Sequence, residues 1–189
     1  EWTSAKDKEE LTEMMNEKMS AIPGVNLSFE QPIQMRFNEM IAGIKSSNEK
    51  IKLMNSLQNQ YPGSSLAQDA NLEIALTYIT DEKFGEAIPY LDKILVSSNE
   101  GMKPKALAKK ALAYYNANNN KQALSSYKEL IQKYPQSAEA NDALINIKDI
   151  YVEEGNPNEY LQLMKENGKI VSATEADELT YNAALLKYN

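Results

Sequence analysis

The sequence contains no cysteine and no histidine among its 189 residues. The lack of cysteine excludes a disulfide framework, a thiolate metal site and a cysteine nucleophile. The lack of histidine removes the commonest zinc ligand and the usual general base near neutral pH. No apolar run approaches the roughly 18 residues of a membrane span, and no signal peptide is visible. We therefore expect no catalytic residues, no resident metal and no cofactor.

Basic residues are also fewer than acidic residues. Lysine and arginine number 20 against 27 acidic residues, which gives a net charge of −7 and a sequence pI near 4.8. Binding to a phosphate backbone needs a clustered basic face, so nucleic acid is not an expected partner. The chain is 42% hydrophobic, enough for one or two domains or a short repeat array.

A ten-residue phrase occurs twice. YPGSSLAQDA at residues 61–70 returns as YPQSAEANDA at residues 134–143, an offset of 73 residues. That offset is two repeats of about 36 residues, and a middle copy places Ala106 in the slot held by Ala70 and Ala143. A period of this length is typical of stacked supersecondary units.

Each unit predicts two helices. Apolar residues recur with a helical period in two groups, separated by turns at residues 116–120 and 155–157. Tyr61 and Tyr134 each precede a proline and should end helices, because a residue before proline avoids the α region. Ser64 and Ser137, two positions after the prolines, should cap the next helices. The predicted units are residues 64–98, 99–135 and 136–168, followed by a single helix at 174–188.

The pattern of small and aromatic residues resembles the tetratricopeptide repeat (TPR). It comprises Ala75, Tyr78, Phe84, Ala87 and Leu91 in the first unit, and Ala111, Tyr114, Ala123, Tyr127 and Pro135 in the second. The third unit has Tyr160 where the packing alanine should be, which predicts a wider helix spacing. The resemblance covers residues 48–189 and implies an all-α superhelix of antiparallel helix pairs. The Tyr-Pro-x-Ser-x-x-Ala form is most similar to TPR proteins of Gram-negative envelopes, so a periplasmic or outer-membrane-associated location is expected.

The resemblance also implies which residues bind a partner. In TPR arrays the first helices line a concave groove that holds a protein or peptide segment. The expected groove contacts are Asn71, Lys110, Asn141 and Lys148, whose amides could bond an extended backbone and whose ammonium groups could hold a carboxylate. The expected packing residues are Ala75, Tyr78, Ala87, Ala111, Tyr114, Ala123, Tyr127 and Tyr151.

Both ends of the array look incomplete. Residues 48–60 read as a second helix without its first, so something upstream should cover it. Residues 174–188 read as a first helix whose partner has been cut off. An uncovered apolar stripe favours association, and self-association through this last helix is expected.

Residues 1–46 do not show the repeat pattern. They predict a helix at residues 8–19, a short strand at 25–29 and a second helix opened by Pro32. The sequence of residues 22–46 resembles a porter-domain segment of heavy-metal efflux pumps of the resistance-nodulation-division family. Those pumps are several times longer, so transport is not inferred. The change near residue 47 suggests a fusion of two unrelated fragments, natural or made in the laboratory.

The junction itself could be helical. A continuous helix from about residue 32 to 60 is predicted by a heptad-like phase kept by Ile33, Phe37, Met40, Ile44, Ile51 and Met54. Its weak points are Gly43 and residues 46–48.

Methionines offer the one hint of metal chemistry. Thioethers bind cuprous ion, but methionine also fills core gaps on amphipathic helices, and we favour the core interpretation. The residues are Met14, Met15, Met19, Met35, Met40 and Met54. The leading function is a noncatalytic protein-binding scaffold. The alternatives are an enzyme or metal handler built on the N-terminal piece, and a chimera with no evolved function.

Overall fold

The structure is a computed structural model that describes residues 39 and 41–188. This part of the chain is helical and contains no strand, which confirms the all-α prediction. The helix, strand and helix expected within residues 1–46 lie almost wholly outside the described residues. The elements are α3 (Ser47–Gln60), α4 (Ser65–Thr80), α5 (Phe84–Leu95), the 3-10 helix η2 (Glu100–Met102), α6 (Lys103–Asn116), α7 (Asn120–Lys133), α8 (Ala138–Glu153), α9 (Pro157–Glu166) and α10 (Ala173–Tyr188).

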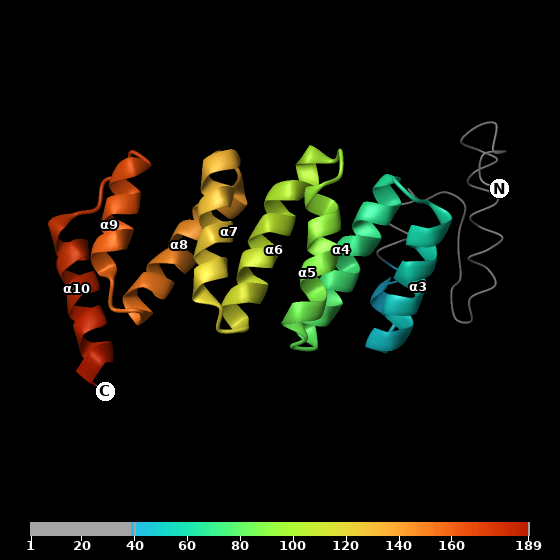
Figure 1. Cartoon of the computed structure of the whole chain (residues 1–189), viewed down its shortest axis with the longest axis horizontal. Helices are drawn as coiled ribbons and strands as arrows, with labels where there is room; N and C mark the ends of the chain where they lie inside the picture. The colour runs from blue at the N-terminus through green and yellow to red at the C-terminus, as the bar shows by residue number, and fades with distance from the viewer. Residues whose placement is uncertain (1–38, 40, 189) are drawn as a thin grey trace.

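The helices stand side by side in chain order, from α3 at one end to α10 at the other (Figure 1). Each helix packs mainly on its neighbours in sequence, so α4–α5, α6–α7 and α8–α9 form successive pairs. The first helices α4, α6 and α8 also approach one another, more closely than the second helices do. They therefore lie on the inner side of the stack, which is the TPR-like arrangement predicted.

The repeated phrase explains where helices end and begin. α3 ends one residue before Tyr61, and α7 ends one residue before Tyr134. The Ser64 hydroxyl then accepts the Ala67 N–H at 3.1 Å, and the Ser137 hydroxyl accepts the Ala140 N–H at the same distance. Both serines have extended backbone and cap the following helix, as predicted.

The serine cap at the start of α10 was not predicted. The Ser172 hydroxyl accepts the Glu175 N–H at 3.2 Å at the start of α10. No Tyr-Pro pair precedes it, so the phrase gave no signal there.

Small residues allow the helices of each pair to pack closely. Ala75 and Ala87 lie between α4 and α5, and Ala111 and Ala123 lie between α6 and α7, all fully buried. The larger Tyr127 and Tyr151 are also buried, while Tyr78 and Tyr114 are half-buried against the hydrophobic clusters. These eight residues are the ones that the TPR resemblance implies for packing.

The third pair is different. Tyr160 occupies the alanine slot and is buried. α8 and α9 come close over fewer residues than the helices of the two earlier pairs. A tyrosine cannot let two helix axes approach as an alanine does, and α9 is also short, at 10 residues. This agrees with the wider spacing predicted for the unit.

The prediction of one continuous helix from residue 32 to 60 was wrong. Residues 44–46 are not helical, and α3 begins afresh at Ser47. Ser46 takes an extended conformation, with φ −92° and ψ 120°, and its hydroxyl accepts the Glu49 N–H. Serine caps helices more readily than it continues them, so the local preference overrides the heptad phase.

Ile41 covers part of the first repeat from upstream. It is buried in one cluster with Met54, Leu57, Ala70 and Ile74. Met54 is fully buried there, which fits the core interpretation of this methionine and not a metal ligand. The other five methionines considered as ligands lie outside the described residues.

Candidate functional site

A cleft of about 350 Å³ opens between the first helices of the second and third units. Both walls come mainly from the N-terminal halves of α6 and α8, and the second helix α7 contributes one tyrosine. The lining residues are Lys105, Ala108, Lys109 and Leu112 from α6, Glu139, Asp142, Ala143 and Asn146 from α8, and Tyr127. The cleft therefore lies on the inner side of the stack.

The two walls carry opposite charge. Lys105 and Lys109 stand one turn apart on α6, and Glu139 and Asp142 stand three residues apart on α8. None of these four side chains forms an ion pair with another described residue. The charges are therefore free to contact a ligand, and the small residues Ala108 and Ala143 leave room between them.

A hydrogen bond joins the two helices near their other ends. The Tyr115 hydroxyl, near the end of α6, donates to a Glu153 carboxylate oxygen at 2.7 Å, at the end of α8. This bond to Glu153 raises the pKa of Tyr115 to about 12, with burial adding to the effect. The phenol therefore stays protonated across the physiological range and the bond persists.

Tyr127 is the buried aromatic side chain of the cleft. It is 1% exposed, and its hydroxyl has no hydrogen-bond partner within the described part of the chain. Burial raises its pKa to about 12, with a smaller contribution from Tyr115. A neutral buried phenol is neither a nucleophile nor a general base near pH 7, so the residue contributes shape and apolar surface.

The four residues expected to contact a partner lie in different environments. Asn71 is 5% exposed, so it does not reach the open inner surface. Lys110 points between helices, where its Nζ lies 2.6 Å from an Asp92 carboxylate oxygen on α5. Lys148 is half-buried, and Asn141 is exposed on α8. Asn141 is thus the best placed of the four for contact with a second chain.

None of the cleft residues was predicted as a partner contact from the sequence, and Tyr127 was predicted only as a packing residue. The helical phase of each residue could have identified them. Ala111 faces α7, and on a helix of 3.6 residues per turn Lys105, Lys109 and Leu112 lie on a different face. The TPR resemblance, applied to polar positions of the first helices, selected Lys110, whose phase directs it toward α5.

The described residues lack the features of a metal site and of a membrane span. They contain no group of three or more histidine, cysteine, aspartate or glutamate side chains arranged to hold a metal ion. The pair Glu153 and Glu154 is exposed, and Glu153 bonds Tyr115. No helix among these residues is long and apolar enough to cross a membrane.

Stacked helix pairs with an open, charged cleft on the first-helix side define a TPR-like helical-repeat protein. The chain belongs to the YfiO family, described as an outer membrane lipoprotein family, whose model matches residues 43–153. The match covers more than half of the chain and includes both walls of the cleft. It confirms the expected location, in the periplasm or at the outer membrane of a Gram-negative bacterium.

Curated relatives match only a short stretch. A segment of 46 residues is 48% identical to protein HelA of Legionella pneumophila, covering 24% of this chain and 4% of HelA. A segment of 37 residues is 51% identical to the cobalt-zinc-cadmium resistance protein CzcA of Cupriavidus metallidurans, covering 20% of this chain and 4% of CzcA. The chain thus spans about one twenty-fifth of the length of each relative.

Proposed function

We propose that the chain is a noncatalytic scaffold that holds an extended segment of another envelope protein in the cleft between α6 and α8. The observation that carries this proposal is the cleft itself, with its unpaired lysine wall and unpaired carboxylate wall. Asn141, although exposed on α8, is not among the residues that line the cleft. A fixed stack of helices presents such a surface without refolding, which limits the entropic cost of binding.

The placement of the charged pairs favours binding over catalysis. The ion pairs Lys50–Glu73, at 2.9 Å, and Lys110–Asp92 join neighbouring helices and do not line the cleft. A catalytic lysine or carboxylate needs a partner held within hydrogen-bond reach in a shaped pocket. The charged groups of the cleft instead stand apart on opposite walls, as expected for contact with another chain.

Photo-crosslinking in Gram-negative cells tests the proposal. A photoreactive phenylalanine at Leu112, on the cleft wall, should form adducts with a protein partner. The same residue at Ser125, exposed on the second helix α7, is the matched control and should form none. Adducts of equal yield at both positions, or adducts at Ser125 alone, would contradict a cleft-bound partner.

The short efflux-type match supports a second proposal, which concerns origin and not activity. We propose that the chain joins a fragment of the efflux-pump type to a YfiO-type array near residue 47. The matches to HelA and CzcA support it, but they cover too little of those proteins to carry a transport function. Amplification of source DNA across codons 40–55 tests it: a single product establishes a natural join, and two separate loci establish an artificial one.

A further inference from the structure

The cleft between α6 and α8 has a charge pattern that selects among extended segments. We infer that it binds a strand-like stretch in which acidic and basic residues alternate. This inference rests on the proposed function and specifies the partner of the same site. It follows from the spacing of the charges on each wall and from the way side chains leave an extended backbone.

The wall of α6 presents two positive charges at a fixed interval. Lys105 and Lys109 are four residues apart, so at about 1.5 Å per residue their positions are about 6 Å apart along the helix. Alternate residues of an extended strand are about 6.6 Å apart and point to the same side. Two acidic residues at alternate positions of a bound strand therefore match this wall.

The wall of α8 presents the opposite sign. Glu139 and Asp142 face the same cleft and are about 4.5 Å apart along their helix. The intervening residues of the bound strand point toward this wall, because successive side chains of a strand alternate in direction. Basic residues at those positions complete the pattern, and small or apolar ones would leave both carboxylates unpaired.

The remaining lining fits a backbone and not a bulky group. Ala108 lies on the wall of α6, and Ala143 and Tyr127 are buried beneath the cleft. The small side chains of the two alanines leave room for a backbone, and Leu112 and Asn146 extend the lining toward the joined helix ends. A folded helix about 10 Å or more across needs more width than a strand does.

Peptide binding tests the inference directly. A fluorescent eight-residue peptide of alternating glutamate and lysine, blocked at both ends, is compared with a block peptide of four glutamates followed by four lysines. Fluorescence anisotropy at low salt should show the alternating peptide binding the full chain about tenfold more tightly. Equal affinity for the two peptides would overturn the inference.

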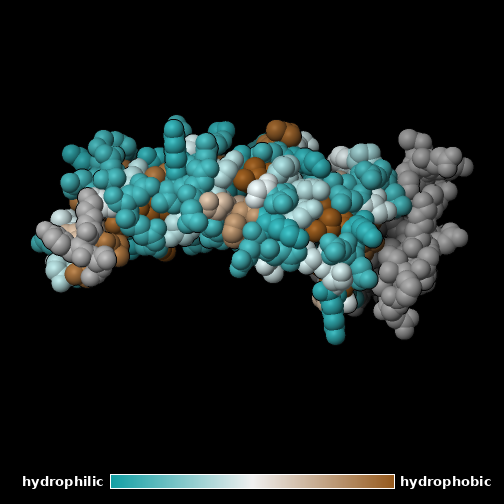
Figure 2. Space-filling model, turned by 60° about the horizontal axis from the view of Figure 1, so that its bottom comes forward, coloured by the Kyte–Doolittle hydropathy of each residue, from teal (hydrophilic) through white to brown (hydrophobic). Residues whose placement is uncertain are grey.

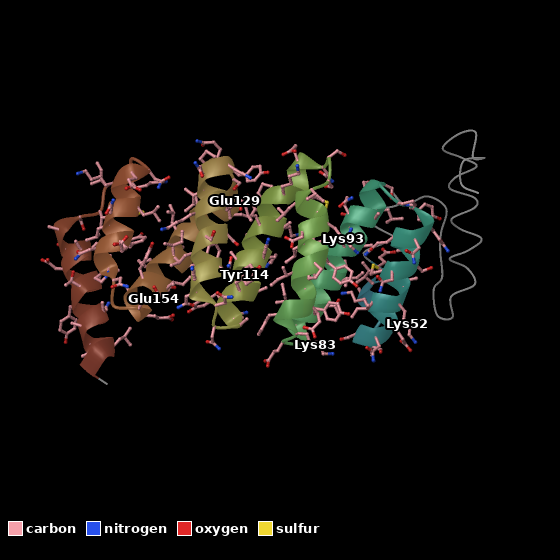
Figure 3. All side chains as sticks on the ribbon, in the orientation of Figure 1. Lys52, Lys83, Lys93, Tyr114, Glu129 and Glu154 are labelled. Atoms are coloured by element: carbon pink, nitrogen blue, oxygen red, sulfur yellow. The ribbon has the colours of Figure 1, made fainter. Side chains whose placement is uncertain are left out.

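Charge-reversal variants give a sharper test. K105E/K109E makes both walls acidic and should weaken the alternating peptide about tenfold. E139K/D142K makes both walls basic and should weaken it to a similar extent. The control K52E/K121E changes the net charge as K105E/K109E does, at exposed lysines that do not line the cleft. Lys52 lies on α3, several helices from the cleft (Figure 3), and the control should bind normally.

The fourfold variant K105E/K109E/E139K/D142K exchanges the two walls. An alternating strand can shift by one residue and present its charges to the opposite sides, so this variant should regain the affinity of the wild type. Circular dichroism confirms folding of each variant, and the two double variants test the same point independently. Failure of the fourfold variant to regain binding while it remains folded would overturn the inference.

If crosslinking at Leu112 succeeds while both peptides bind alike, only the inference fails. If Leu112 forms no adduct, the proposed function fails as well.

Discussion

The Tyr115 hydroxyl donates a hydrogen bond of 2.7 Å to Glu153, and the bond connects residues 38 positions apart. It joins the first helix of one unit to the first helix of the next, at the opposite end from the charged cleft. The walls are therefore tied at one end and open at the other.

Replacing Tyr115 with phenylalanine should remove this tie. We expect Y115F to lower the free energy of unfolding by about 1 kcal/mol, the usual net value of one such bond. Urea denaturation measures the loss. Y114F is the matched control, because Tyr114 makes no hydrogen bond from its hydroxyl within the described residues and should change stability little. Equal effects of the two substitutions would argue against the bond.

The capping serines should each stabilise a helix. S64A and S137A remove hydroxyls that accept backbone N–H groups at 3.1 Å. Loss of such a cap costs about 1 kcal/mol, so each variant should unfold at lower urea concentration. S125A alters an exposed serine within α7 and should be neutral or slightly stabilising, because alanine favours helix. A loss in S125A as large as in S64A would contradict the capping role.

Ile41 should stabilise the first repeat from outside the array. It is 8% exposed and contacts the cluster of Met54, whereas Ile170 is 96% exposed. I41A should therefore cost about 2 kcal/mol or more in unfolding free energy. The control I170A should cost almost nothing. In I41A, amide hydrogen exchange should become faster in α3 and α4 than in the wild type. An equal change in exchange across the whole array would contradict a local role of Ile41.

The buried hydroxyl of Tyr127 should contribute no stability at neutral pH. Because it lacks a partner in the described chain, Y127F should leave the free energy of unfolding unchanged or raise it by up to about 1 kcal/mol. The measurement is urea denaturation at pH 8. A loss of more than about 1 kcal/mol would indicate a bond that the structure does not contain.

The same tyrosine gives a pH dependence with a definite sign. Its pKa is raised from 10.0 to about 12 on folding, so the folded state favours the neutral phenol. That stabilisation is complete below pH 10 and is lost as the pH rises toward 12. Y127F should therefore gain about 1 kcal/mol relative to the wild type between pH 8 and pH 11. A constant difference between the two proteins would contradict the raised pKa.

The repeated phrase made the helical array predictable. Tyr61 and Tyr134 each end a helix, and Ser64 and Ser137 each begin one, because proline chemistry and side-chain capping are local effects. The break at residues 44–46 was not predicted. The heptad spacing of apolar residues does not detect that Ser46 prefers to cap a helix.

The cleft was less predictable than the fold. Surface lysines carry no sequence pattern of their own, and only the position of Ala111 in the core reveals which face Lys105 and Lys109 occupy. Lys110, adjacent to Lys109 in sequence, pairs with Asp92 on the neighbouring helix. A single step along a helix turns a side chain by about 100°, so a polar position on the first helix was not enough to separate the two.

Apolar side chains are also exposed on the described surface of the stack. In the face shown, hydrophobic atoms form small separate patches on a mainly hydrophilic surface (Figure 2). Three large apolar side chains, Tyr181, Leu185 and Leu186, are exposed together on α10, whereas Val96 and Ile170 lie in separate segments of the chain. Isolated apolar residues are normal on a protein surface, while the group on α10 keeps self-association through this helix a prediction.

The most direct test of the central claim is a map of amide chemical shifts on the labelled protein. The segment captured by crosslinking at Leu112 is added as a synthetic peptide. The account predicts shift changes concentrated on α6 and α8, around Ala108 and Asn146, with little change on the exposed faces of α5 and α7. Changes centred on the second helices, with the cleft residues unaffected, would contradict it.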